Sequence, residues 1–131
     1  MKRDLLKFEF GDQQLTESAR HKAWKNVLCG CGSETEVQFG PRRRLDCANL
    51  NLSTCGEVEL NRRRIPRDVG KLSAMRSSGT CDNPVLAVKS SDYQYARGLA
   101  KKKAIQVVDA SAWNLGIRQA SCSLKKRIEL L

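Results

Sequence analysis

Two stretches decide the expected fold: Arg42-Arg43-Arg44-Leu45-Asp46 and, after ten further residues, Glu57-Val58-Glu59-Leu60. Acidic residues two positions apart on a β-strand point to the same face, so Glu57 and Glu59 are predicted to share one side. A tight hairpin would bring Asp46, on the preceding strand, next to them. Three carboxylates that converge in an otherwise basic chain are typical of a divalent-metal site that faces phosphate.

The overall charge favours a polyanionic partner. The chain of 131 residues has 24 Lys and Arg against 14 Asp and Glu, which gives a formal net charge of +10. Such an excess most often indicates nucleic acid, because Lys and Arg displace counterions from phosphates. An anionic membrane competes as a partner, but no segment approaches the ~20 apolar residues of a spanning helix. Charged residues in 1–7 replace the apolar core of a signal peptide, so we expect a soluble, cytoplasmic (intracellular) protein without membrane association.

The cysteines allow three interpretations. The chain has six of them, at positions 29, 31, 47, 55, 81 and 122. Buried free thiols would behave as small apolar residues. Structural zinc would use Cys29, Cys31, Cys47 and Cys55, although the usual second close pair is missing. Disulfides are rare inside ordinary cells but frequent in intracellular proteins of some hyperthermophiles.

Periodicity and turn residues predict one domain over residues 1–131. Helices are expected at 15–28, from 65, from 91 or 92 to 102, and at 124–131, and strands at 34–39, 45–52, 55–60, 85–88 and 105–108. Three strands joined by short turns favour an antiparallel meander, whereas the later strand, helix, strand unit favours a parallel crossover. The predicted fold class is therefore α/β, with a mixed β-sheet flanked by helices on both faces.

This order of elements resembles the restriction-endonuclease-like superfamily, the PD-(D/E)XK nucleases, over roughly residues 15 to 110. The core of that family is α-β-β-β-α-β, with an Asp on the second strand and a (D/E)-X-K tripeptide on the third. Asp46 would be the family's Asp, and Glu57-Val58-Glu59 would be the tripeptide, with Glu59 in place of the usual lysine. The proline that usually precedes the Asp is absent. The resemblance implies a metal-dependent endonuclease.

The resemblance also implies a site for Mg²⁺ or Mn²⁺. Asp46 and Glu57 would bind the ion and the Val58 carbonyl would complete the protein ligands, because Mg²⁺ prefers oxygen and keeps several waters. Glu59 would orient the water, and Lys71, on the helix after the third strand, would return an ammonium group to the site. Whether Glu59 or Lys71 activates the water stays open. Glu17 on the first helix is a candidate outer carboxylate, although a solvated position is also compatible with its place in the sequence.

Basic clusters flank the proposed carboxylates, and their arginines would bind the phosphate backbone of DNA. The residues concerned are Arg43, Arg44, Arg62, Arg63 and Arg64. In a different interpretation, Asp46, Glu57 and Glu59 form a solvated strand face and pair with Arg43, Arg62 and Arg63. His21, the single histidine, is expected to be a surface residue of the first helix.

The preferred hypothesis is a homodimeric DNA endonuclease, since cleavage of a duplex needs two active sites. A non-catalytic nucleic-acid-binding protein on the same fold is the alternative. A zinc-stabilised binding module is a third.

Overall fold

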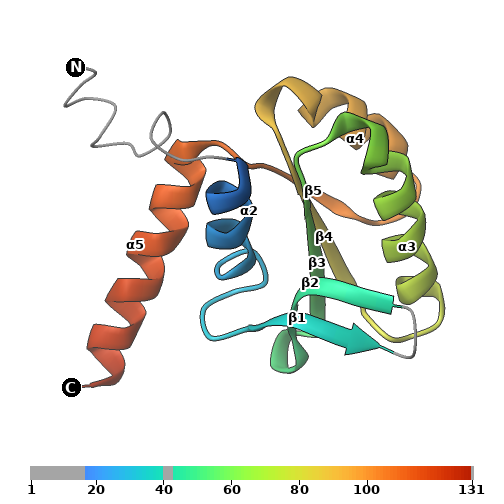
Figure 1. Cartoon of the computed structure of the whole chain (residues 1–131). Helices are drawn as coiled ribbons and strands as arrows, with labels where there is room; N and C mark the ends of the chain where they lie inside the picture. Colours follow the sequence, from blue (N-terminus) through green and yellow to red (C-terminus); the bar gives the residue numbers. More distant parts are fainter. Residues whose placement is uncertain (1–16, 40–42, 131) are drawn as a thin grey trace, which may run out of the picture.

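The computed structural model describes residues 17–39 and 43–130, and its elements follow the predicted order (Figure 1). The helices are α2 (Glu17–Lys25), α3 (Ile65–Ser77), α4 (Tyr93–Ala100) and α5 (Ala112–Glu129), and the strands are β1 (Glu34–Phe39), β2 (Arg43–Asn49), β3 (Thr54–Glu59), β4 (Asn83–Val88) and β5 (Gln106–Asp109). Short 3-10 helices lie at η1 (Leu50–Leu52), η2 (Arg62–Arg64) and η3 (Ser90–Asp92). Within the described ranges, no helix combines the length and the apolar character needed to cross a membrane.

The strands of the described residues form one mixed sheet in the order β1-β2-β3-β4-β5. Strand β2 pairs antiparallel with β1 and β3, whereas β4 pairs parallel with β3 and β5. Helix α3 connects β3 to β4 and α4 connects β4 to β5, as parallel pairing requires. The predicted meander, the crossover and the mixed α/β class are therefore confirmed.

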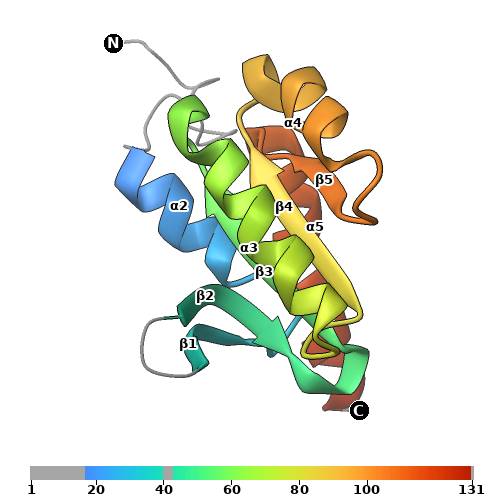
Figure 2. The ribbon, with the colours of Figure 1, turned by 90° about the vertical axis from the view of Figure 1, so that its right-hand side faces the viewer.

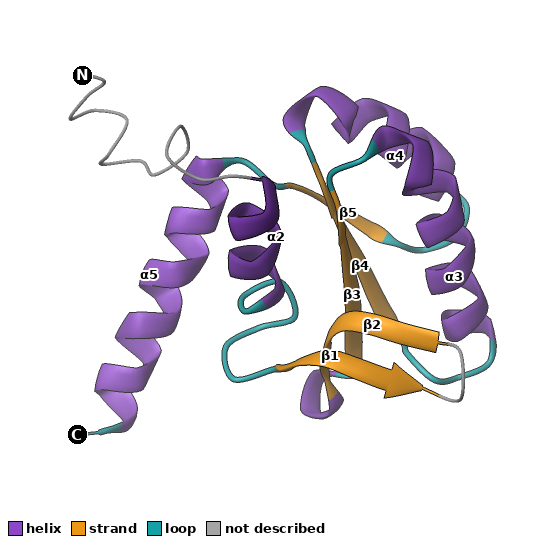
Figure 3. Ribbon diagram, viewed as in Figure 1, coloured by secondary structure: helices purple, strands orange, loops and turns teal. Residues whose placement is uncertain are grey.

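The helices cover both faces of the sheet (Figure 3). On one face, α2 and α5 enclose a core that contains Trp24, Val27, Leu28, Val58 and Leu115. On the other face, α3 and α4 enclose a second core that contains Leu45, Ile65, Leu72, Leu86 and Ala96. In the view of Figure 2, α3 crosses in front of the sheet along the direction of β4. Residues of β3 therefore contact α2 with one face and α3 with the other.

Most element boundaries differ from the prediction by one to three residues; the first helix, for example, ends at Lys25 rather than at residue 28. The second strand ends at Asn49 rather than Leu52, because the Asn49 side chain accepts a hydrogen bond from the Leu52 backbone N–H (3.3 Å) and starts η1. The last helix begins at Ala112 rather than Leu124. Its first turn is capped by Ser111, whose hydroxyl accepts a hydrogen bond from the Asn114 N–H (3.1 Å). The predicted boundaries at Leu15 and Leu131 lie outside the described residues.

All six cysteines form disulfides, in the pairs Cys29–Cys47, Cys31–Cys122 and Cys55–Cys81. The free-thiol and zinc interpretations are therefore wrong. The Cys31–Cys122 bond spans 91 residues and joins the turn after α2 to the middle of α5. Closing so long a loop lowers the conformational entropy of the unfolded chain. This stabilises the folded state by about 4 to 5 kcal/mol.

Gly56, at the centre of β3, generates a testable prediction. A Cβ atom built there would lie 3.0 Å from the sulfurs of Cys29 and Cys47 and 3.0 Å from Leu28 Cδ2. Because a buried disulfide cannot easily move, Gly56→Ala should lower the free energy of unfolding by about 1 to 3 kcal/mol. Urea denaturation measures the change.

The control is Gly70→Ala on the exposed side of α3, where a Cβ meets nothing within 4 Å. That substitution should stabilise the protein by up to about 1 kcal/mol, since Ala is the better helix former. Equal effects of the two substitutions would contradict close packing at Gly56.

Candidate functional site

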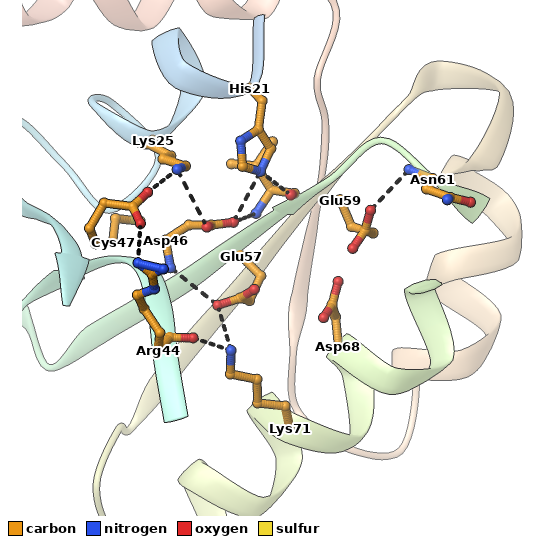
Figure 4. Close-up of polar contacts among 12 residues, drawn as sticks. His21, Lys25, Arg44, Asp46, Cys47, Glu57, Glu59, Asn61, Asp68 and Lys71 are labelled. Carbon is orange, nitrogen blue, oxygen red and sulfur yellow. Dashed lines mark hydrogen bonds and ion pairs between the residues drawn. The ribbon is translucent and has the colours of Figure 1, made fainter. Parts of the chain in front are cut away.

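Strands β2 and β3 part at Asp46 and Glu57. Their backbone ladder pairs residues 47–49 with 54–56. Beyond this ladder, carboxylate side chains take the place of backbone carbonyl groups as hydrogen-bond acceptors. The Asp46 N–H donates to Glu57 Oε2 (3.1 Å), and the Val58 N–H donates to Asp46 Oδ2 (2.7 Å) (Figure 4). Each carboxylate therefore binds the backbone of the other strand. This exchange holds both acids in fixed positions where the strands separate.

Helix α2 brings a histidine to this opening. His21 Nε2 lies 2.8 Å from the Val58 carbonyl oxygen and 3.4 Å from Asp46 Oδ2. Since a carbonyl oxygen can only accept a hydrogen bond, Nε2 carries a proton and is the donor to Val58. The hydrogen bond to Asp46 raises the pKa of His21. Burial opposes ionisation of Asp46, but the hydrogen bonds from His21 and the Val58 N–H prevail and lower the pKa of that carboxyl group.

A row of ion pairs between acidic and basic side chains extends from Asp46 to β1. Lys25 Nζ lies 3.9 Å from Asp46 Oδ1 and also pairs with Glu36. Arg44 Nη1 lies 3.2 Å from the other Glu36 oxygen and is largely exposed. Beside this chain is a hollow of about 280 Å³, whose lining includes His21, Lys22 and Lys25. A larger hollow between α4 and β5 has no carboxylate in its lining, so we do not assign the site to it.

On the opposite face of the sheet, α3 supplies the predicted ammonium group. Lys71 Nζ lies 3.2 Å from Glu57 Oε2 and donates to the carbonyl oxygen of Arg44. Glu57 is only 7 % exposed. Burial, followed by the negative charge of Asp46, raises the pKa of Glu57, and Lys71 opposes that rise. The structure thus brings Lys71 to the site from fourteen residues away in the chain.

Glu59 lies next to an aspartate that the sequence analysis missed. Glu59 Oε2 accepts a hydrogen bond from the Asn61 N–H (3.0 Å), and Asp68, on α3, faces it (Figure 4). Asp68 is 1 % exposed, and neither of its carboxylate oxygens has a hydrogen-bond partner. Arg67 Nη2 lies 3.6 Å from Asp68 Oδ1. Burial, followed by the hydrogen bond that a protonated Asp68 can donate to the facing Glu59 and by the negative charges of Glu59 and Glu57, raises the pKa of Asp68 to about 8.

The predicted site residues are thus only partly brought together. Glu57 and Glu59 share the α3 face, as predicted, whereas the carboxylate of Asp46 turns towards α2. These acids are mostly buried and pair with residues of α2 and α3, so the interpretation of a solvated strand face is wrong. The predicted pairing with Arg43 lies outside the described side chains.

His21 is half-buried against Asp46 and is not the plain surface residue that was expected. The sequence held a signal for it, because His21 precedes the core residue Trp24 by three positions and so shares its helix face. Asp68 likewise lies four positions before the buried Leu72. The side chain of Glu17 lies outside the described part of the structure.

The arginines lie near the same edge of the sheet. Arg62 stacks over the Tyr95 ring (4.0 Å to the centroid) and pairs with Asp92 (3.2 Å). Arg63 and Arg64 are exposed in η2, directly after β3. The side chain of Arg43 is not among those described. An exposed basic surface therefore continues from the carboxyl end of β3.

Two of the proposed metal ligands converge on one imidazole nitrogen. Asp46 Oδ2 and the Val58 carbonyl oxygen both contact His21 Nε2, which occupies the position between them. The third, Glu57, uses one oxygen to bind the Asp46 N–H and Lys71. Among the described residues, no three His, Cys, Asp or Glu side chains are arranged to hold a metal ion. The oxygen donors suit Mg²⁺ or Mn²⁺, but His21 has to move before an ion can take its place.

Comparison of the chain with family models, with curated proteins and with solved structures finds no match. The candidate site is therefore interpreted from its own geometry.

The buried Asp68 generates a prediction about pH. In the folded state Asp68 keeps its proton up to about pH 8, whereas an unfolded Asp loses it near pH 4. The folded state therefore binds more protons in this window, and wild-type stability should fall as pH rises through it, by at most about 1.4 kcal/mol per pH unit. Asp68→Asn should remove that component, which urea denaturation at a series of pH values measures.

Asp82→Asn, at an exposed position before β4, is the matched control and should keep the wild-type slope. Identical slopes in the wild type and in Asp68→Asn would show that Asp68 ionises normally in the folded protein.

Proposed function

We propose that the protein is a metal-dependent endonuclease that hydrolyses DNA phosphodiester bonds at the opening between β2 and β3. The observation that carries this proposal is that Asp46 and Glu57 hold each other in fixed positions where β2 and β3 separate, with Lys71 bound to Glu57 and an exposed basic surface nearby. General chemistry supports it, because phosphodiester hydrolysis needs water activation and cations that stabilise the charge of the transition state.

The topology supports the same proposal. The described elements contain the α-β-β-β-α-β order that characterises the restriction-endonuclease-like fold. Asp46 lies on the second strand and Glu57-Val58-Glu59 on the third, which are the positions that the resemblance requires. We therefore propose that specific fold within the observed α/β class.

Each site residue then has a role. Asp46, Glu57 and the Val58 carbonyl would hold Mg²⁺ or Mn²⁺, which supplies Lewis-acid chemistry and lowers the pKa of bound water. Glu59 orients the water, and Lys71 places a positive charge beside Glu57 that offsets charge on the phosphate. Exposed Arg44, Arg62, Arg63 and Arg64, together with Arg43, bind the DNA backbone.

Partners and location follow from this proposal. Cutting both strands of a duplex requires two copies of the site, so we propose a homodimer. We also propose an intracellular location, where DNA is found. The three disulfides restrict that location to cells whose interior tolerates them, as in some hyperthermophiles.

The test is cleavage of linear, nicked and four-way-junction DNA with Mg²⁺ or Mn²⁺. Asp46→Asn, Glu57→Gln and Lys71→Met should each slow cleavage about a hundredfold or more, because each removes several kcal/mol of transition-state stabilisation. The two amides keep an oxygen that can accept the hydrogen bond from the opposite strand, so the fold should persist. Fluorescence anisotropy should show that DNA binding is retained.

Glu129→Gln and Lys102→Met are matched controls on exposed positions of α5 and of the segment after α4, and both should cleave like the wild type. Wild-type rates in all three site variants would refute the proposed assignment. Absence of cleavage by the wild type on every substrate, with DNA binding intact, would favour the non-catalytic alternative.

One observation favours that alternative, a DNA-binding protein without catalysis. His21 and Lys71 already satisfy the oxygens that a metal ion would use. If a metal competes with His21, His21→Ala should enlarge the rise in melting temperature that Mn²⁺ causes, whereas His21→Arg, which keeps a cation there, should not. Thermal melts with and without Mn²⁺ measure this. If Mn²⁺ does not raise the melting temperature of either variant, His21 and Lys71 are structural partners of the carboxylates and the site does not bind metal. That result would support a DNA-binding protein without catalysis.

A further inference from the structure

Helix α5 contacts the rest of the protein with only one of its sides. Leu115 is its buried residue, and Cys122, seven positions later, packs against the same core and carries the disulfide to Cys31. Seven residues make about two turns, so these two positions share a face. Residues 123–130 are all exposed. Figure 1 shows α5 at the periphery, on the same side of the sheet as α2.

An apolar stripe lies on the opposite side of α5. Ile117 and Leu124 follow Leu115 and Cys122 by two positions each, which turns them about 200° around the helix. With Ala120 and Ile128 they recur every three or four residues. Ile117, Leu124 and Ile128 are 52 %, 54 % and 60 % exposed. A continuous row of large apolar side chains at this spacing is typical of a helix that packs against another helix.

We propose that this stripe is the surface on which a second copy of the chain docks, with the two α5 helices packed antiparallel about Ala120. In that arrangement Ile117 of one copy meets Leu124 of the other, so the stripe is complementary to itself, as a twofold interface requires. Pairing two such faces would remove the exposed parts of Ile117, Leu124 and Ile128 of both copies from water, which favours association. The inference concerns assembly and stands whether or not the site cleaves DNA.

The charges on α5 select the antiparallel orientation. Lys125, Lys126 and Arg127 follow one another in the last turns of the helix. In a parallel pair the two basic clusters would face each other and repel. In an antiparallel pair each cluster lies beside residues 114–116 of the other copy, which carry no charge. The helix dipoles also oppose each other in this orientation.

Gly116 is consistent with close approach of a second helix. It interrupts a helix at a cost of about 1 kcal/mol relative to Ala. Within the described part of the chain, a Cβ added there would meet nothing within 4 Å, so packing inside the protein does not require a glycine. Together with Ala120 it leaves little side-chain bulk near the centre of the stripe.

The test is the oligomeric state of the oxidised, full-length protein by analytical ultracentrifugation at micromolar concentrations. The wild type should sediment as a dimer, and Ile117→Lys combined with Leu124→Lys should halve the mass. The control combines Gln119→Lys with Ser123→Lys, which adds the same charge at exposed positions of α5 outside the stripe. This control should remain dimeric. A monomeric wild type, or a dimeric stripe variant, would overturn the proposal.

A mixing experiment tests the orientation and guards against misfolding of the double variant. Ile117→Lys and Leu124→Glu should each be monomeric alone and should form a dimer when mixed, because the new charges meet only in an antiparallel pair. Ile117→Lys mixed with Ile117→Glu should stay monomeric. The reverse pattern would mean parallel packing. Binding of a monomeric wild type to anionic vesicles, lost in the stripe variant, would assign the stripe to a lipid surface instead.

Discussion

The candidate site depends on one exchange of hydrogen bonds, in which Asp46 and Glu57 each accept a backbone N–H of the opposite strand. A buried carboxylate needs donors and a nearby cation, and the backbone alone supplies only the donors. The cations come from the covering helices: His21 and Lys25 from α2, and Lys71 from α3. The helix positions that face the two carboxylates at the end of the β2–β3 ladder are therefore the ones occupied by basic residues.

The parts of the site that depend on local periodicity could be predicted from the sequence. Glu57 and Glu59 share a face because side chains alternate along a strand, whatever the rest of the fold does. The order of elements and the change from antiparallel to parallel pairing followed from the lengths of the connections. The position of Lys71 near Glu57 was implied by the resemblance alone, and the contact forms because α3, directly after β3, packs back over that strand.

The remaining parts depend on which helix face meets which strand, and short-range patterns do not report this. His21 and Asp68 occupy core-facing positions of α2 and α3, but polar residues at such positions are buried only where the sheet offers a partner. The bond between Cys31 and Cys122 joins residues 91 positions apart, and spacing alone cannot select it among the fifteen possible pairings of six cysteines. The first part of α5 was missed because its apolar residues lie on two opposite sides.

The two sides of the sheet differ in how their charges balance. On the α2 side, Asp46 and Glu36 are offset by His21, Lys25 and Arg44. On the α3 side, the carboxylates of Glu57, Glu59 and Asp68 pair with Lys71 and the mostly exposed Arg67. The α3 side therefore carries surplus negative charge, and the proton retained by Asp68 neutralises it. The net charge of +10 thus hides a local excess of acid on this side of the sheet.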